Sequence, residues 1–145
     1  MSSPAESTES KHVIIVEDNT TTNDLLCDWL KPHFNVTGYL DAEAALKALS
    51  HPCPGQTVFV VDYNLPGMNG IDLRAKLGEK FPTAKYILIS GLFDEKLLNE
   101  ARQAGYDATL PKPFPMPTLF KKVQDLFALP AAQPNLVEKI KQQPA

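Results

Sequence analysis

Short apolar runs alternate with helical patterns along most of the chain. The segments 12–16 and 57–61 are continuous apolar runs, which is typical of strands buried on both faces of a sheet. The segments between such runs carry apolar residues at the spacing of a helix face. In the first of them, the residues at helical spacing are Leu25, Leu26, Trp29 and Leu30, and we expect Trp29 to be a partly buried packing residue.

This pattern predicts strands and helices in strict alternation. The predicted strands cover residues 12–16, 36–39, 57–61, 86–89 and 109–110. The predicted helices cover residues 21–31, 42–50, 71–80, 95–104 and 117–127. Pro32 ends the first helix, Asp41 is expected to cap the second, and Pro117 lies in the first turn of the last. Alternation of this kind predicts an α/β fold with a doubly wound five-stranded parallel sheet and helices on both faces.

The two ends of the chain differ in composition from the alternating part. Residues 1–11 are rich in Ser, Glu and Thr, and we expect a disordered tail there. Residues 129–145 are rich in Pro, Ala and Gln, which indicates a tail or an interdomain linker, with 135–142 as a candidate short helix. The predicted domain is 12–128. We expect it to stand alone unless the last segment links it to a further domain of a longer protein.

Length and composition are those of an ordinary globular domain, with 145 residues, 43% of them hydrophobic. The net charge of −3, without a cluster of Lys and Arg, argues against a nucleic-acid surface. No apolar run approaches the roughly 20 residues that cross a bilayer, and the start lacks the apolar run of a signal peptide. Cys27 and Cys53 lack the spacing of metal or redox sites, so we expect reduced thiols and a cytoplasmic protein.

Polar side chains are found where the predicted strands end. Glu17 and Asp18 follow the first strand, and Asp62 follows the third. Ser90 follows the fourth strand, and Lys112 lies just after the fifth. Ligands of open α/β sheets bind beyond the carboxyl ends of the strands. We therefore expect three carboxylates, a hydroxyl and an ammonium group to meet at one edge of the sheet.

Three carboxylates at one edge call for a cation. Two carboxylates about 4 Å apart repel each other by roughly 4 kcal/mol at an effective dielectric constant near 20. Oxygen ligands suit a hard divalent ion, so we expect Mg²⁺ or Mn²⁺ as the cofactor. With the ion bound, an Asp carboxylate can attack a phosphoryl group. Lys112 can then hold the phosphate oxygens, and Ser90 can donate a hydrogen bond to them.

Four short motifs, in this order, resemble the receiver domains of bacterial response regulators of the chemotaxis-regulator type. They are the pair Glu17-Asp18 after VIIV, VVDYNLPGMNG around Asp62, ISG at Ser90 and LPKPF at Lys112. The resemblance implies the (βα)5 flavodoxin-like fold with strand order 2-1-3-4-5. It also implies a two-component phosphorelay, in which a sensor histidine kinase or a histidine phosphotransfer protein phosphorylates the domain and so switches its protein–protein interactions.

The resemblance implies a role for each acidic position. Asp62 matches the phosphoacceptor of the family. Asp18 matches the direct ligand of the metal ion, and Glu17 matches the residue that holds the ion through water. The side chain of Asp62 and the backbone carbonyl of Asn64 complete the implied ligand set.

The other motif residues match the phosphate-binding and switching parts of the family. Lys112 matches the phosphate-binding lysine, and its bond to Pro113 corresponds to a bond that is cis in receivers. Ser90 matches the switch hydroxyl, which moves toward the phosphate. The aromatic residue that usually lies three positions before the lysine is Thr109 here. We therefore expect a smaller rearrangement on the output face, which in the family is formed by the fourth helix, the fifth strand and the fifth helix and binds the downstream partner.

The resemblance also bears on the lifetime of the phosphorylated state. In receivers, the side chains two residues after the phosphoacceptor and two residues after the switch hydroxyl flank the path of the hydrolytic water. Here they are Asn64 and Leu92. Asn64 can hydrogen-bond that water, whereas Leu92 cannot, so we expect an intermediate lifetime.

Two other functions fit part of the pattern. A small Mg²⁺-dependent phosphohydrolase of the haloacid dehalogenase type also combines an Asp nucleophile with Ser or Thr and Lys. That class carries a second Asp two residues after the nucleophile, where this chain has Asn64, and it carries a cap insertion. A degenerate receiver that only scaffolds usually lacks an acidic position or the lysine. We therefore expect a signalling domain whose only catalysis is its own phosphoryl transfer and slow autodephosphorylation.

Overall fold

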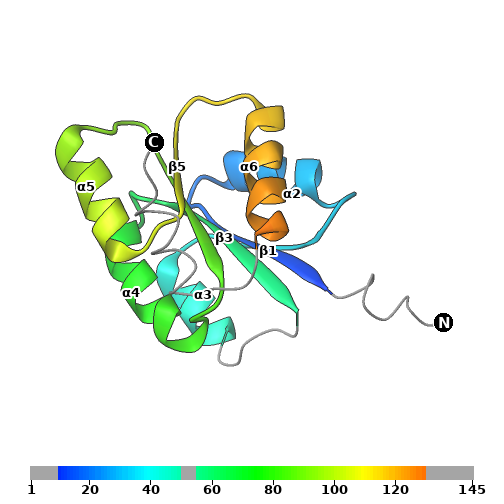
Figure 1. Ribbon diagram of the computed structural model, residues 1–145, viewed down its shortest axis with the longest axis horizontal. Helices are drawn as coiled ribbons and strands as arrows, with labels where there is room; N and C mark the ends of the chain where they lie inside the picture. Colours follow the sequence, from blue (N-terminus) through cyan, green and yellow to red (C-terminus); the bar gives the residue numbers. More distant parts are fainter. Residues whose placement is uncertain (1–9, 50–54, 130–145) are drawn as a thin grey trace, which may run out of the picture.

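The computed structural model describes residues 10–49 and 55–129, in which strands and helices alternate along the chain (Figure 1). The strands are β1 (Lys11–Val16), β2 (Asn35–Tyr39), β3 (Gln56–Asp62), β4 (Lys85–Ser90) and β5 (Ala108–Pro111). The helices are α2 (Thr20–Leu30), α3 (Ala42–Ala48), α4 (Gly70–Lys80), α5 (Glu95–Ala104) and α6 (Met116–Ala128). Each predicted element is confirmed, with bounds that differ by at most two residues.

The strands form one parallel sheet in the order β2-β1-β3-β4-β5. The predicted fold class and strand order are confirmed. The chain moves outward from β1 to β2 and then crosses over to β3 on the other side of β1. The carboxyl ends of β1 and β3 therefore flank the point at which the strand order reverses, where open sheets of this kind bind ligands.

Alternate strand residues pack on opposite faces of the sheet, which explains the continuous apolar runs. Ile14 and Val16 of β1 face a cluster that includes Leu73 of α4 and Leu97 of α5. The other cluster is formed by α2, α6 and the intervening strand residues, and its members include Val13, Ile15, Leu26, Leu30, Leu119 and Val123. Both layers are visible in Figure 1, with α2 and α6 on one side and α3, α4 and α5 on the other.

Two local features fix where helices begin. Asp41 caps α3 as predicted, because its side chain accepts a hydrogen bond of 2.7 Å from the backbone N–H of Ala44. Gly70 opens α4 directly against the end of β3. A Cβ atom at Gly70 would lie 2.9 Å from the carbonyl oxygen of Asp62, so a side chain there would push α4 away from the end of β3.

The apolar residues of α2 are not all buried. Leu25 is 53% exposed and Trp29 is 39% exposed. The inward stripe consists of Asn23, Leu26 and Leu30, at intervals of three and four residues. Leu25 and Trp29 lie on a neighbouring stripe. Trp29 makes an edge contact with Phe120 at 6.3 Å between ring centroids, which fits the packing role predicted for it.

The domain boundaries at the chain ends stay predictions. Strand β1 begins at Lys11, and the backbone carbonyl of Ser10 accepts a hydrogen bond from the backbone N–H of Gln56. The rest of the predicted N-terminal tail, Cys53 and the candidate helix 135–142 lie outside the described residues. Among the helices in 10–49 and 55–129, none has the length and apolar character to span a membrane.

Candidate functional site

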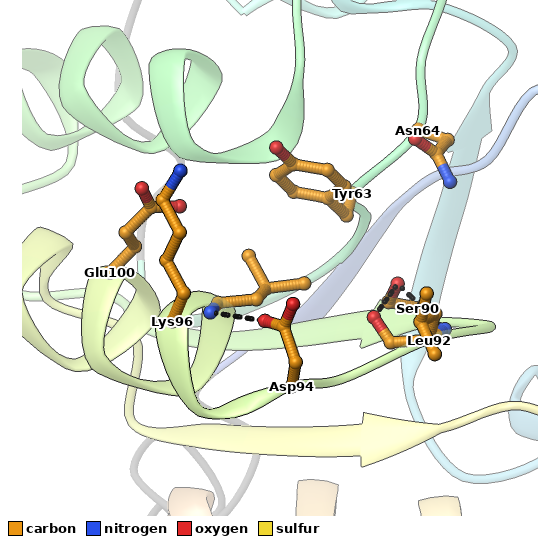
Figure 2. Close-up of a pocket in the computed structure, with 8 residues that line it drawn as sticks. Tyr63, Asn64, Ser90, Leu92, Asp94, Lys96 and Glu100 are labelled. Carbon is orange, nitrogen blue, oxygen red and sulfur yellow. Dashed lines mark hydrogen bonds between the residues drawn. The ribbon is translucent and has the colours of Figure 1, made fainter.

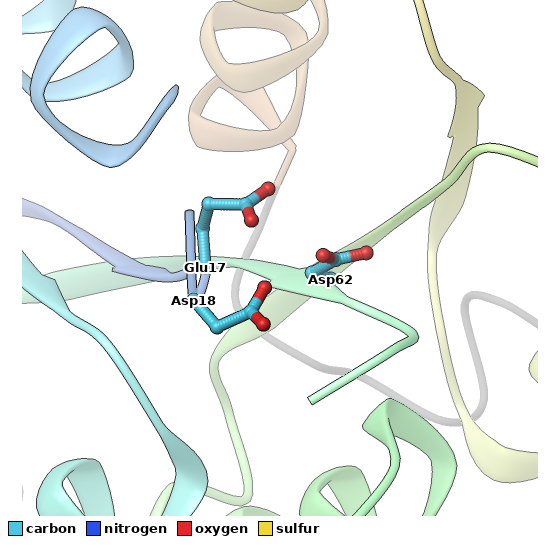
Figure 3. A group of neighbouring side chains, drawn as sticks. All are labelled: Glu17, Asp18 and Asp62. Atoms are coloured by element: carbon cyan, nitrogen blue, oxygen red, sulfur yellow. The ribbon is translucent and has the colours of Figure 1, made fainter. Parts of the chain in front are cut away.

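Three carboxylates meet at the carboxyl ends of β1 and β3 (Figure 3). Glu17 and Asp18 follow Val16, whose register partner on β3 is Val61, the residue before Asp62. One oxygen atom from each carboxylate lies within 4.8 Å of the other two. Glu17 is 1% exposed and Asp62 is 4% exposed, whereas Asp18 faces solvent. The structure thus brings together the acidic residues that the strand ends predicted.

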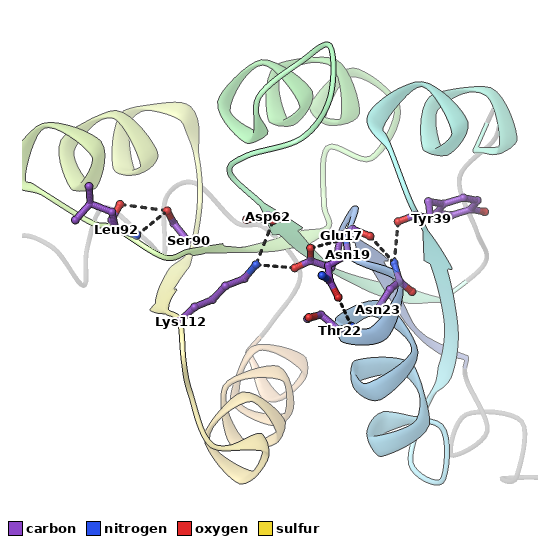
Figure 4. Close-up of polar contacts among 9 residues, drawn as sticks. All are labelled: Glu17, Asn19, Thr22, Asn23, Tyr39, Asp62, Ser90, Leu92 and Lys112. Atoms are coloured by element: carbon purple, nitrogen blue, oxygen red, sulfur yellow. Dashed lines mark hydrogen bonds and ion pairs between the residues drawn. The ribbon is translucent and has the colours of Figure 1, made fainter.

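Lys112 is the cation of this cluster (Figure 4). Its Nζ atom lies 2.8 Å from Oε1 of Glu17 and 3.2 Å from Oδ2 of Asp62. The backbone N–H of Lys112 donates to the carbonyl oxygen of Ser90 at 2.8 Å, which extends the pairing of β4 with β5 by one bond. The peptide bond between Lys112 and Pro113 is cis, as the resemblance implied.

Burial and the charges of the cluster shift the pKa values of two groups. Burial, and next the negative charge of Glu17, raise the pKa of Asp62 to about 6, although Lys112 and the backbone N–H of Asn64 act in the opposite direction. Burial alone would lower the pKa of Lys112. The hydrogen bond to Glu17 and the charge of Asp62 outweigh burial and raise that pKa, so Lys112 stays protonated at neutral pH.

Two asparagines hold Glu17, and the sequence pattern did not predict either role. The backbone N–H of Asn19 donates to Oε2 of Glu17 at 3.0 Å, while the Asn19 side chain caps α2 by accepting from the N–H of Thr22 at 2.8 Å. The buried side chain of Asn23 donates to the backbone carbonyl of Glu17 at 2.9 Å. The sequence did contain one indication of the role of Asn23, since this polar residue lies at helical spacing with the buried residues Leu26 and Leu30 of α2.

Ser90, Asn64 and Leu92 line a pocket of about 280 Å³ together with Tyr63, the residue after Asp62 (Figure 2). The Ser90 hydroxyl donates to the carbonyl oxygen of Leu92 at 3.1 Å and accepts from the N–H of Leu92 at 3.2 Å. In this structure the hydroxyl is thus engaged with its own loop. The Leu92 side chain is 75% exposed at the pocket rim, on the opposite side of Ser90 from Lys112 in Figure 4.

Thr109, at the position where the resemblance implies a switch aromatic, is half-buried in β5, with Leu88 of β4 as its register partner. A tyrosine is nevertheless buried nearby. The hydroxyl of Tyr106 donates to the carbonyl oxygen of Gly70 at 2.7 Å, and the Gly70 N–H donates to the carbonyl oxygen of Tyr63 at 2.8 Å. These two bonds connect the segment between α5 and β5 with the residue that follows Asp62.

The donor set fits Mg²⁺. In octahedral Mg²⁺ coordination, oxygen ligands lie about 2.1 Å from the ion, so that two direct ligands are at most about 4.2 Å apart. A cluster spanning 4.8 Å therefore suits direct carboxylate ligands together with one carboxylate held through water. All three donors are hard carboxylate oxygens, and within the described residues this group contains neither histidine nor cysteine, the donors that softer ions favour.

Comparison with known proteins agrees with this geometry. The family model for the response regulator receiver domain matches residues 13–124. The chemotaxis protein CheY-3 of Vibrio cholerae is 33% identical over 119 residues, which cover 79% of this chain and 90% of that protein. A cyclic di-GMP phosphodiesterase of Thermotoga maritima is 31% identical over 112 residues, which are 77% of this chain and 29% of that protein.

Solved structures share the fold. The CheY-like receiver domain protein of Methanospirillum hungatei superposes with a TM-score of 0.75 at 24% identity, and the match covers 81% of this chain and 94% of that one. In the present chain, the order of the four motifs, the residues at the strand ends and the extent of the family match all support one assignment. The chain belongs to the response regulator receiver domain family.

Proposed function

We propose that this receiver domain accepts a phosphoryl group on Asp62 and thereby switches protein–protein interactions in a two-component phosphorelay. The observation that carries the proposal is the position of Asp62. Its carboxylate is nearly buried at the reversal of strand order, shares a cluster with Glu17 and Asp18, and lies 3.2 Å from the Nζ atom of Lys112. A buried carboxylate with an adjacent cation and an oxygen-rich metal site is suited to attack a phosphoryl group.

The proposed metal ligands are the side chains of Asp18 and Asp62, the backbone carbonyl of Asn64 and, through water, Glu17. Mg²⁺ or Mn²⁺, when bound, supplies positive charge that reduces the repulsion between the carboxylates and an anionic phosphoryl donor. Lys112, whose Nζ atom lies 3.2 Å from Oδ2 of Asp62, supplies a second positive charge. Its pKa is raised, so it remains an ammonium group that can pair with phosphoryl oxygens.

The proposed transfer uses a histidine-bound phosphoryl group. A carboxylate oxygen of Asp62 forms a bond to phosphorus while the bond between phosphorus and the donor's imidazole nitrogen breaks, and that nitrogen keeps the bonding electron pair. The Ser90 hydroxyl then gives up its hydrogen bonds with the Leu92 backbone and donates to a phosphoryl oxygen. Because those bonds close the loop after β4, their loss frees that loop to move.

The proposed donors are a sensor histidine kinase or a histidine phosphotransfer protein, in the cytoplasm. The proposed output face consists of α5, β5 and α6, with the change concentrated in the loop between β4 and α5 because Thr109 has no ring to rotate. A domain of this kind turns over no external substrate and catalyses only its own phosphorylation and dephosphorylation. A phosphohydrolase of the haloacid dehalogenase type is disfavoured because Asn64, which has no acidic proton, occupies the position of the leaving-group acid.

Treatment with acetyl phosphate and Mg²⁺ is expected to add one phosphoryl group to the wild-type protein and none to Asp62→Asn. Intact-mass spectrometry measures the addition, and hydroxylamine should remove it, because acyl phosphates are labile to this nucleophile. Asp72→Asn, at an exposed acid in the first turn of α4, is the matched control and should be labelled like the wild type. Equal labelling of the wild type and Asp62→Asn would contradict the proposal.

The pocket residues are expected to set the lifetime of the phosphorylated state. Leu92→Asn should speed the loss of the phosphoryl group by about 10-fold, which corresponds to about 1.4 kcal/mol of barrier, because an amide can orient the attacking water. Asn64→Leu should slow the loss for the opposite reason. The decay is followed in Mg²⁺ buffer without a phosphatase. Leu98→Asn, at another exposed leucine, should decay like the wild type. Unchanged decay in both pocket variants would show that these side chains do not control water access.

A further inference from the structure

The side chain of Asn23 joins the carboxyl ends of β1 and β2. Its Nδ2 atom donates to the carbonyl oxygen of Glu17 at 2.9 Å and to the carbonyl oxygen of Tyr39 at 2.9 Å (Figure 4). The backbone N–H of Glu17 donates to that same Tyr39 oxygen at 3.0 Å. Asn23 is only 4% exposed, so solvent does not compete strongly for these bonds. One amide thus continues the pairing of the two strands where the regular ladder stops.

The carbonyl group that Asn23 holds belongs to the peptide unit between Glu17 and Asp18. A rotation of this peptide unit would change the backbone angles on both sides and swing the Asp18 carboxylate relative to Asp62. We infer that Asn23 is a positioning residue for the metal site, because it fixes the orientation of this peptide unit and hence the spacing of the acidic pair. The inference rests on the proposed function of the cluster as a Mg²⁺ site.

Neighbouring residues favour an amide at this position. The Cys27 thiol lies 3.5 Å from Oδ1 of Asn23 and donates to it, so the oxygen faces the thiol and both N–H groups face the carbonyls. A carboxylate would instead place an acceptor against two acceptors. Gly38 leaves the space that the amide fills, because a Cβ atom there would overlap Oδ1 of Asn23 and lie 2.8 Å from the Cys27 sulfur. Asn23, Cys27 and Gly38 therefore form one packed unit behind the acidic pair.

Variants of this unit can separate the contribution of Asn23 to protein stability from its contribution to Mg²⁺ affinity. Gly38→Ala alone should lower the melting temperature, because its methyl group overlaps Asn23. The double variant Asn23→Ala/Gly38→Ala should recover much of that loss, because the new methyl group occupies the space that the amide leaves. It does not restore the donor to the Glu17 carbonyl. Mg²⁺ affinity in the double variant should therefore stay as weak as in Asn23→Ala, even though stability recovers.

The experiment measures Mg²⁺ affinity by calorimetry and amide hydrogen exchange in the metal-free protein, alongside the melting temperatures. Asn23→Ala and Asn23→Asp are expected to weaken Mg²⁺ binding by roughly 10-fold, the typical effect of losing a residue that orients a metal ligand. Exchange at the Glu17 and Asp18 amides should be faster in both variants. Asn99→Ala, at an exposed asparagine of α5, is the control and should match the wild type.

Mg²⁺ affinity that recovers together with the melting temperature in the double variant would reduce Asn23 to a packing residue and overturn the inference. Wild-type affinity in Asn23→Ala would overturn it as well, while leaving the cation site itself intact. A wild-type protein that does not bind Mg²⁺ would instead overturn the proposed metal site and, with it, this role for Asn23.

Discussion

Lys112→Ala is expected to lower the free energy of unfolding of the metal-free domain by roughly 3 kcal/mol. The change leaves the carboxylates of Glu17 and Asp62 without the ammonium group that lies 2.8 and 3.2 Å from them. Removing one partner of a buried ion pair leaves an uncompensated buried charge, and such losses are typically about 3 to 5 kcal/mol. We place the value at the lower end because the Lys112 side chain is 30% exposed. Urea unfolding at neutral pH measures it.

A matched control is available at the surface. Lys121 pairs with Asp125 at 3.2 Å one helical turn away, and both side chains are mostly exposed. Lys121→Ala should therefore change the free energy of unfolding by about 0.5 kcal/mol or less. Mg²⁺ should restore part of the stability lost in Lys112→Ala, because the ion supplies positive charge to the same carboxylates. Equal effects of the two substitutions would mean that Lys112 is a surface lysine and that the acidic cluster needs no cation.

Asp62→Asn is expected to stabilise the metal-free protein by about 3 kcal/mol at pH 7. The pKa of Asp62 is raised from 3.8 to about 6, and each unit corresponds to about 1.4 kcal/mol. The folded state thus binds the Asp62 proton more tightly than the unfolded state does. The protonated Asp62 carboxyl therefore contributes to the free energy of unfolding. This contribution is fully present below about pH 4 and is lost as the pH rises to about 6. Over this range the wild type should lose stability relative to Asp62→Asn.

With Mg²⁺ present, we expect the wild type to become more stable than Asp62→Asn. An ion that binds only the folded state stabilises it by mass action, so millimolar Mg²⁺ should raise the melting temperature of the wild type. Asp62→Asn lacks one ligand and should respond less, and Asp18→Asn should respond less for the same reason. Melting curves with and without the ion, recorded between pH 4 and 7, test both parts. An acidic metal site would be excluded if Asp62→Asn melted at a lower temperature than the wild type and Mg²⁺ left the melting temperature of the wild type unchanged.

The alternation of apolar runs predicted the fold because both faces of the sheet are covered by helices. A strand such as β3 is then apolar throughout, and it contrasts with the helices on either side. The sequence does not show which face of α2 is buried. Leu25 and Trp29 are as apolar as Leu26 and Leu30, so hydrophobicity alone does not identify the buried stripe. That stripe includes Asn23, which makes a hydrogen bond to the carbonyl oxygen of Tyr39 on β2.

The acidic residues and Lys112 could be predicted because strand ends in a parallel sheet meet at one edge whatever the loops do. Finer features depended on contacts between distant segments. Asn23 acts on carbonyl groups from two strands, and a sequence shows only side chains. The orientation of Ser90 depends on rotation about one bond, and the hydroxyl bonds with the Leu92 backbone. Tyr106 lies outside the expected switch position, yet it reaches the start of α4.

The identity of the acceptor is the central claim, and mapping it is the most direct test. After reaction with acetyl phosphate and Mg²⁺, borohydride reduces an aspartyl phosphate to homoserine, and sequencing of the peptides by mass spectrometry locates the change. We expect homoserine at position 62 and unmodified aspartate at position 18, with no conversion when Mg²⁺ is chelated. Homoserine at Asp18, or a hydroxylamine-resistant phosphoryl group on Ser90 with Asp62 unmodified, would contradict the proposed function.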